Sequence, residues 1–402
     1  MSNYPQMSTH EEICTKKSRT CCGMNRSIHK VCEHCEEIFR AKVPMSGHSR
    51  IGTELLRENG FTALRLLAAF LVLMTHSTAL LKAKQDFLGR RHLPQFSELA
   101  VDAFFVISGF LICLALLRNP SIATYIRNRC LRIFPALIVV VLLTILVVGP
   151  LYYTGQNYWV DAKPWQYLWN ITLFWPSLVL PGVFQHNSVA VLNGSLWTLS
   201  VEMLCYSGLL LLSWSRALNW RMLLILFVIT FIVKQNNIIS EENFFLFHCN
   251  RLIMFFIGGS LLATLKNYVP FNKSGLFLSI VLVVYAFYGH RWPVWQQPSL
   301  FLILYPYIII ASALQLKKCH WLDKYDCSYG IYIYAFLIQQ CLIATYGAAH
   351  WSSTEFVLQT TVLTVPIALA SWFLIEKPAL RLKNMSFVPR RVIRVKSLLP
   401  AP

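Results

Sequence analysis

Arg65 and His76 are the residues of this chain whose types and spacing most directly suggest chemistry. They lie eleven positions apart in the apolar segment LRLLAAFLVLMTHSTALL. At about 100° and about 1.5 Å per residue, eleven steps return to nearly the same face of a helix, about 16 Å further along it. An ionisable group inside a membrane costs about 2.5 to 3.5 kcal/mol on insertion scales. An arginine and a histidine on one intramembrane face therefore indicate a partner or a function.

Two carboxylates lie in other apolar segments. Asp102 lies in the outer half of FSELAVDAFFVISGFLICLALL, and Glu202 lies near the middle of the segment that contains NGSLWTLSVEMLCY. A buried carboxylate is neutral, paired, or poised as an acid or base, because burial disfavours its charged form. His76 is the nearest candidate partner of Asp102 in depth. The small residues Ser108 and Gly109 are typical of close helix packing.

Three arginines begin the next apolar segment, in the sequence RNRCLRIFPAL. Arg127, Arg129 and Arg132 precede or flank its first turn, where Pro135 is also tolerated. Guanidinium groups at the start of a helix bind phosphate, aided by unpaired backbone N–H groups. They also anchor a helix on the cytoplasmic side of a membrane. The loop by itself supports both interpretations equally.

The composition of the chain places these residues in a membrane. Of its 402 residues 56% are hydrophobic and only 13% are charged, and the mean hydropathy is +0.50, which excludes an ordinary soluble globule. We therefore predict an all-α polytopic protein with about ten transmembrane helices. The predicted spans are 62–82, 97–117, 133–153, 194–214, 219–234, 251–265, 274–290, 299–316, 327–347 and 355–375.

The distribution of basic residues predicts the orientation of these spans. With both termini in the cytoplasm, 27 of the 36 Lys and Arg residues fall on the inner loops and tails and seven on the outer loops. An eleventh apolar stretch, 165–185, contains Asn170 and is interrupted by Pro176 and Pro181, so we expect an interfacial or re-entrant segment. Counting it as a span would place the basic tail outside. The net charge of +18 is thus explained by topology and lipid headgroups rather than by nucleic acid.

The ends of the chain have a different composition. Residues 1–60 are polar, carry five of the twelve cysteines and contain no visible signal peptide, which predicts a disordered cytoplasmic tail. In an alternative interpretation, Cys32 and Cys35 form half of a zinc site together with two nearby histidines. No other metal is expected. The transmembrane domain is predicted to cover 61–384, and 385–402 form a basic cytoplasmic tail.

These motifs, in this order, resemble the acyltransferase 3 family of integral membrane O-acyltransferases, which modify surface polysaccharides. The resemblance covers about 58–384. Arg65 and His76 are spaced as the family's Arg-x10-His, and Arg129 and Arg132 as its Arg-x-x-Arg. The other matching motifs are VDAFFVISGF, SLWTLSVE with Glu202, SYGIYIY and IEKPALR.

The resemblance implies a bacterial inner-membrane enzyme that moves acetyl from cytoplasmic acetyl-CoA to a sugar hydroxyl of lipopolysaccharide O-antigen or another envelope polysaccharide. It implies that His76 is a general base or acyl carrier and that Arg65 steers the thioester or its oxyanion. Either Asp102 or Glu202 would orient the histidine. The expected acetyl-CoA site comprises Arg129, Arg132 and Ser108. Only about 26 residues follow Glu376, so acceptor specificity is expected to come from a partner protein or from direct action on a lipid-linked saccharide in the membrane.

A proton-coupled transporter or exporter is the competing prediction. His76, Asp102 and Glu202 would then form a proton relay. Transporters usually carry internal repeats, and none is found in this sequence. A transporter also has no need of a phosphate site, so Arg129 and Arg132 would each be dispensable.

Overall fold

The computed structural model of this chain describes residues 59–81, 94–118, 121–174, 176–240, 242–288 and 298–384. Within these ranges the protein is built from helices, together with one isolated bridge between Tyr153 and Val183. The predicted tails 1–60 and 385–402, including Cys32 and Cys35, lie almost entirely outside the described residues.

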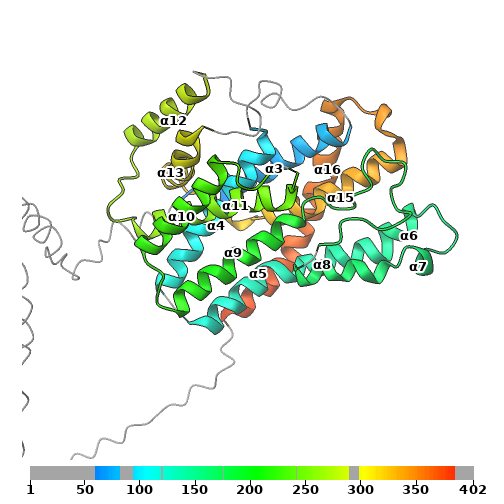
Figure 1. Cartoon of the computed structure of the whole chain (residues 1–402). Helices are drawn as coiled ribbons and strands as arrows, with labels where there is room; N and C mark the ends of the chain where they lie inside the picture. The colour runs from blue at the N-terminus through cyan, green and yellow to red at the C-terminus, as the bar shows by residue number, and fades with distance from the viewer. Residues whose placement is uncertain are drawn as a thin grey trace, which may run out of the picture. The chain divides into compact units, whose positions relative to one another are not determined.

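Within the described residues, ten helices have sixteen residues or more, and each overlaps one of the ten predicted spans. They are α3 (Phe61–Leu80), α4 (Phe96–Arg118), α5 (Ile122–Leu143), α9 (Trp197–Trp214), α10 (Trp220–Gln235), α11 (Phe244–Thr264), α12 (Lys273–Tyr288), α13 (Ser299–Gln315), α15 (Ser328–Tyr346) and α16 (Ser353–Ser371). Eight of them match closely, whereas α11 begins seven residues before the predicted span 251–265. Helix α5 begins eleven residues before the predicted span 133–153 and continues through η2 (Thr144–Val148) and α6 (Gly149–Tyr152). Figure 1 shows their arrangement.

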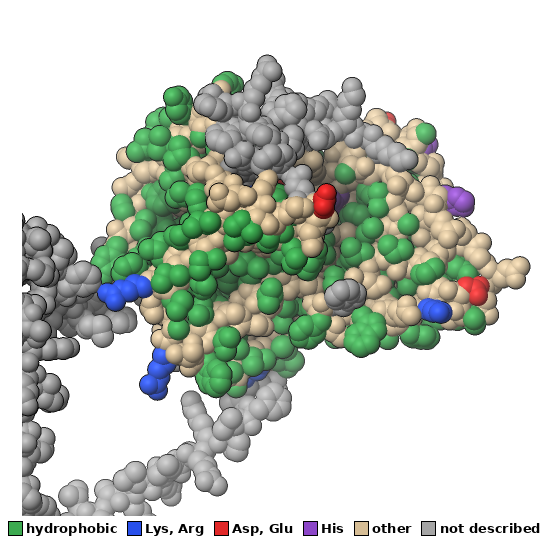
Figure 2. Space-filling view, in the orientation of Figure 1, with side chains coloured by type: hydrophobic (Ala, Val, Ile, Leu, Met, Phe, Trp, Pro, Cys, Tyr) green, Lys and Arg blue, Asp and Glu red, His purple; other side chains and the backbone are tan. Residues whose placement is uncertain are grey.

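Among the described residues, six helical stretches are long and apolar enough to cross a membrane: Phe61–Leu80, Phe96–Arg118, Ile122–Tyr152, Phe245–Thr264, Ser328–Tyr346 and Ser353–Arg381. The remaining helices α9, α10, α12 and α13 have at most 18 residues. Figure 2 shows hydrophobic side chains spread over broad areas of the face in view, as expected of a surface in contact with lipid. The count of ten spans and the side of each terminus stay predictions.

The interrupted stretch 165–185 does not form a long helix. It contains η3 (Pro164–Leu168) and α8 (Trp169–Thr172), after which the chain continues without regular structure through both prolines. Together with α6 (Gly149–Tyr152) and α7 (Tyr158–Asp161), these short helices lie to one side of the long ones (Figure 1). The prolines remove backbone donors and prevent a continuous span, as the sequence predicted.

Helices α4 and α11 pack with their backbones in close contact. A Cβ atom at Gly109 would overlap the carbonyl oxygen of Phe256, and one at Gly259 would overlap that of Val106. Ser260 Oγ reinforces the crossing by donating to the Gly109 carbonyl over 3.1 Å. Small residues therefore allow α4 to approach α11 closely, and α4 also contacts α3 and α9.

Two turns of π-helix widen the long helices α5 and α16 at their C-terminal ends. They are η2 (Thr144–Val148) and η5 (Trp372–Glu376), and η5 continues into α17 (Lys377–Arg381) and η6 (Leu382–Asn384). Each π turn ends two residues before a proline, Pro150 or Pro378. A proline ring crowds the carbonyl one turn earlier, so a wider turn accommodates it.

Candidate active site

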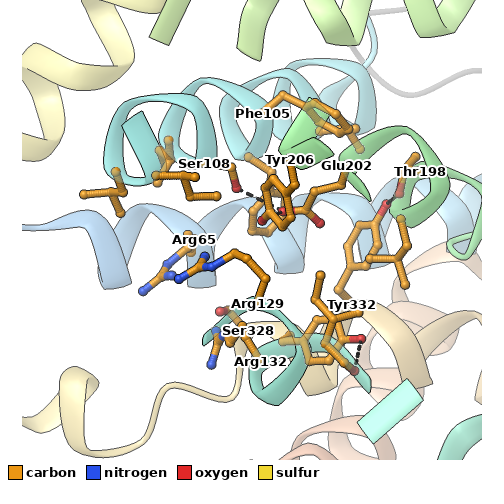
Figure 3. A pocket seen from close by; sticks show the side chains of 18 residues that line it. Arg65, Phe105, Ser108, Arg129, Arg132, Thr198, Glu202, Tyr206, Ser328 and Tyr332 are labelled. Carbon is orange, nitrogen blue, oxygen red and sulfur yellow. Dashed lines mark hydrogen bonds between the residues drawn. The ribbon is translucent and has the colours of Figure 1, made fainter. Parts of the chain in front are cut away.

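A pocket of about 120 Å³ lies between α3, α4, α5, α9 and the start of α15. Five of the seven predicted site residues line it: Arg65, Ser108, Arg129, Arg132 and Glu202 (Figure 3). The first residues of α15 and the first turns of α3 and α9 meet here with the middle of α4 and α5. The two remaining predicted residues, His76 and Asp102, do not line this pocket.

Asp326 joins two of these arginines. Its Oδ2 lies 3.2 Å from a terminal nitrogen of Arg65 and 3.2 Å from one of Arg132. Ser328 Oγ, from the first residue of α15, donates to Oδ1 over 2.7 Å and so orients the carboxylate. Burial would raise the pKa of Asp326, but the two guanidinium groups and Ser328 hold it at about 2. Asp326 is therefore a fixed negative charge between α3 and α5.

Arg132 is held on three further sides. Its other terminal nitrogen lies 3.8 Å from Glu376 Oε2, at the end of the π turn η5. The guanidinium carbon lies 5.9 Å from the ring centre of Tyr329 and 6.0 Å from that of Trp372. Arg132 and Arg65 together thus face two carboxylates, Asp326 and Glu376, and little of their charge is left uncompensated.

Glu202 anchors a second group of polar side chains in the pocket. Ser108 Oγ donates to Glu202 Oε1 over 3.1 Å, and the hydroxyl of Tyr206 donates to the same oxygen (Figure 3). The guanidinium carbon of Arg129 lies 5.8 Å from the centre of the Tyr206 ring. Ser108 was predicted as a donor-binding residue, and its hydroxyl is in a position to serve either Glu202 or a ligand.

His76 lies further along α3. It is half-buried, and its ring packs edge-on against Phe336 of α15 with the ring centres 5.2 Å apart. Its Nδ1 has no hydrogen-bond partner among the residues that the structure describes. Nearby, Gln339 ties α15 to α3 by donating to Ser77 Oγ over 2.7 Å and to the Leu73 carbonyl over 2.9 Å. Packing rather than a carboxylate therefore orients His76.

The expected pairing of Asp102 with His76 is not what the structure shows. Asp102 is fully buried, and its Oδ1 lies 3.4 Å from Nε of Arg251 on α11. Arg251 also lies 3.4 Å from Glu98. This ion pair belongs to the close crossing of α4 and α11, so Asp102 compensates Arg251 rather than the histidine. Its place in a catalytic site stays an untested prediction.

Asp326 and Glu376 are the site residues that sequence reasoning missed, together with Tyr206. Asp326 lies in a loop just before a predicted span, where a carboxylate has no obvious reason to be buried. Glu376 belongs to IEKPALR, a motif that matched the family but in which no residue was assigned a role. The sequence did contain one indication of these carboxylates. Arg65, Arg129 and Arg132 need acidic partners if they are buried, because an unpaired buried guanidinium is costly. The described residues contain no group of His, Cys, Asp and Glu side chains placed to hold a metal.

Comparison with known proteins identifies the kind of protein to which this site belongs. A family model described as an acyltransferase domain, that of acyltransferase 3, matches residues 58–376. An O-acetyl transferase of Shigella phage Sf6 is 27% identical over 339 residues, which cover 80% of this chain and 96% of that protein. Nodulation protein 10 of Rhizobium leguminosarum bv. viciae is 29% identical over 371 residues, which cover 83% of this chain and 96% of that protein. No solved structure matches.

The family match covers Arg65, His76, the paired arginines Arg129 and Arg132, and Glu202. It also reaches Glu376 at the far side of the arginine cluster. It favours the predicted acyltransferase over the predicted transporter. With helices long enough to cross a membrane and a match over most of its length, this chain belongs to the acyltransferase 3 family of membrane acyltransferases.

Proposed function

We propose that this protein transfers an acetyl group from acetyl-CoA to a sugar hydroxyl of a bacterial surface polysaccharide, such as the lipopolysaccharide O-antigen. The observation that carries the proposal is the pocket in which Arg129 lies beside Arg65 and Arg132, in a chain that belongs to an acyltransferase family. The O-acetyl transferase among its relatives supports acetyl as the group transferred.

The arginine-lined pocket would bind the donor from the cytoplasmic side of the inner membrane. Acetyl-CoA is polyanionic, and guanidinium groups bind phosphate through paired, charge-assisted hydrogen bonds. Since Arg65 and Arg132 are engaged by Asp326, Arg129 is the arginine of the pocket best able to accept a new anion. The pocket volume of about 120 Å³ suits a phosphate-bearing part of the donor rather than the whole molecule.

His76 would act on the acceptor further along α3, about 16 Å from Arg65. As a general base, its imidazole takes the proton from the sugar hydroxyl as the oxygen attacks the thioester carbonyl. The new carbon–oxygen bond replaces the carbon–sulfur bond, and the CoA thiolate leaves and takes up a proton. In the alternative route the imidazole first carries the acetyl group itself. Arg65, about 16 Å from His76 along α3, would steer the donor so that its thioester reaches the histidine.

The test measures O-acetyl groups on purified surface polysaccharide by proton NMR. A deletion strain is complemented with wild type, His76→Ala, Arg129→Ala or the control variants His320→Ala and Arg118→Ala, which change exposed residues outside the pocket. We expect acetyl signals with wild type and with both controls. In His76→Ala, which lacks the general base, we expect the rate of acetylation to fall about 100-fold or more. Equal acetylation in the deletion strain and in all complemented strains would refute the proposal.

A further inference from the structure

The phenyl ring of Phe336 on α15 is the support against which the His76 imidazole packs. The two rings meet edge-on at 83°, with their centres 5.2 Å apart. The terminal torsion of a histidine side chain is broad, so the surroundings of the imidazole decide how it is turned. Its Nδ1 forms no hydrogen bond within the described part of the chain. Contact with Phe336 therefore takes the place of a hydrogen bond in holding the ring.

Phe336 is itself held in an apolar cluster between α3, α15 and α16. The other buried members of this cluster are Leu80, Leu342, Ile343 and Phe356. Only 7% of Phe336 remains exposed. Protein interiors are close-packed, so a ring in such a cluster keeps its place unless a neighbour displaces it.

Gly194 leaves room for the Phe336 ring. It lies in the segment that precedes α9, and a Cβ atom there would come within 2.8 Å of Cε2 and 3.0 Å of Cζ of that ring. The backbone of Gly194 does not adopt a positive φ, so this contact alone excludes a larger residue. Because Phe336 is buried, its ring could yield only by leaving its place beside His76.

The segment 193–198 is fastened to α15 at both ends. The buried Asn193 donates from Nδ2 to the Ile333 carbonyl over 2.7 Å. At the other end, Thr198 Oγ1 and the Tyr332 hydroxyl lie 2.6 Å apart and share a hydrogen bond (Figure 3). Thr198 and Tyr332 both line the arginine pocket. The segment therefore touches the donor pocket at one end and the support of the histidine at the other.

A reacting group must be held accurately relative to the bound donor, because a small misplacement is costly in rate. We propose that Phe336 is the positioning residue of His76 and that Gly194 keeps it there, so that the segment 193–198 fixes the histidine relative to the donor pocket. This inference rests on the proposed function, which makes His76 the general base or acyl carrier.

The first test measures acetyl transfer. Inverted membrane vesicles from the deletion strain carrying wild type or one variant receive radiolabelled acetyl-CoA. The initial rate of label transfer to the polysaccharide of these membranes gives kcat and KM for acetyl-CoA, per amount of protein that elutes as a monodisperse peak after extraction. The matched controls are Phe277→Leu, at a side chain that is 70% exposed on α12, and Gly208→Ala, where nothing lies within 4 Å of the added Cβ atom.

Phe336→Leu keeps an apolar side chain but removes the ring, and Gly194→Ala displaces the ring. We expect each variant to lower kcat about tenfold, with KM for acetyl-CoA within about threefold of wild type. The double variant should be no slower than Phe336→Leu, because leucine lacks the Cε2 and Cζ atoms that the added methyl group would meet. Unchanged kcat in the single variants would overturn the inference, and so would losses that multiply in the double variant.

A His76→Ala background separates positioning from stability. It contains no imidazole to orient, so adding Phe336→Leu should leave the residual rate within about twofold of that of His76→Ala alone. A further loss of about tenfold in this background would show that Phe336 only stabilises the fold, and would refute its role as a positioning residue.

Chemical modification of His76 gives a readout that needs no acetyl transfer. Diethyl pyrocarbonate reacts with neutral imidazole, and mass spectrometry of the purified protein in nanodiscs reports the rate at each histidine. Without its support, His76 should react about threefold faster or more in Phe336→Leu and in Gly194→Ala, whereas the exposed His320 should react as in wild type. An unchanged rate at His76 would overturn the inference.

Support of the histidine and acetyl transfer can fail separately. Faster modification of His76 in both variants, without any transfer of label by wild type, would refute the proposed function and leave the orientation of His76 by Phe336 intact. Transfer of label by wild type that is indifferent to Phe336 and Gly194 would refute only the positioning role.

Discussion

At the scale of single residues, the carboxylate of Asp326 holds two guanidinium groups of the pocket in place. Asp326 bonds Arg65 and Arg132, and its side chain retains only 11% of its exposure. Replacing Asp326 by Asn leaves two like charges close together without their shared counter-ion. Removing one partner of a buried ion pair costs about 3 to 5 kcal/mol. We expect a clear fall in the thermal unfolding temperature in detergent.

Asp161→Asn is the matched control for this change. Asp161 is exposed and accepts from the Tyr153 hydroxyl and the Asn157 backbone, so its loss should cost at most about 1 kcal/mol. If Asp326→Asn unfolds at the same temperature as Asp161→Asn, Asp326 does not stabilise the arginine pair.

Asp326 also shows which part of the site could not be predicted from the sequence. Arg65, Arg129, Arg132 and Glu202 could be singled out from their types and from the family motifs. Asp326, the partner of Arg65 and Arg132, is 261 positions from Arg65, and no local pattern in the sequence indicates that pairing. The partner of Asp102 was predicted from depth alone, and the structure pairs it instead with Arg251, because the close crossing of α4 and α11 brings that arginine nearer.

At the scale of elements, the crossing of α4 and α11 depends on two glycines. Gly109→Ala and Gly259→Ala each place a methyl group onto a carbonyl oxygen of the facing backbone, so the helices must separate. Overpacking of this kind costs about 1 to 3 kcal/mol. We expect a lower unfolding temperature in detergent for both variants.

Gly208→Ala on α9 provides the comparison, because nothing lies within 4 Å of its added Cβ. There the better helix propensity of alanine should leave stability unchanged or raise it by up to about 1 kcal/mol. Equal unfolding temperatures for the three alanine variants would show that the crossing tolerates separation.

At the scale of the whole molecule, the orientation of the ten helices decides which side receives the donor. Cys319 is exposed in the loop before α15, and the ten-span prediction places it in the cytoplasm. In a variant with Cys319 as the only cysteine, a membrane-impermeant maleimide should label inverted vesicles but not intact cells. Labelling of Cys319 in intact cells would instead support the eleven-span orientation, in which the stretch 165–185 crosses the membrane.

Asn236→Cys, in a variant without other cysteines, is the control for the opposite side. Asn236 is exposed at the end of α10, in a loop that the ten-span prediction places outside. This cysteine should react with the maleimide in intact cells.

The approximate positions of the long helices could be predicted from apolar runs in the sequence, since a chain segment in lipid must form its backbone hydrogen bonds internally. Their sidedness rests on the distribution of charge alone.

The π turn at Trp372–Glu376 has a consequence for how this family member tolerates insertions and deletions. A π turn contains one residue more than the α-helical turn it replaces. Deleting one residue there would restore a regular helix of nearly the same length and hydropathy, with the span itself preserved. Every side chain beyond the deletion would turn by about 100° relative to those before it. Glu376 would then turn away from Arg132, so a deletion that leaves the hydropathy nearly unchanged would remove one ion pair of the site.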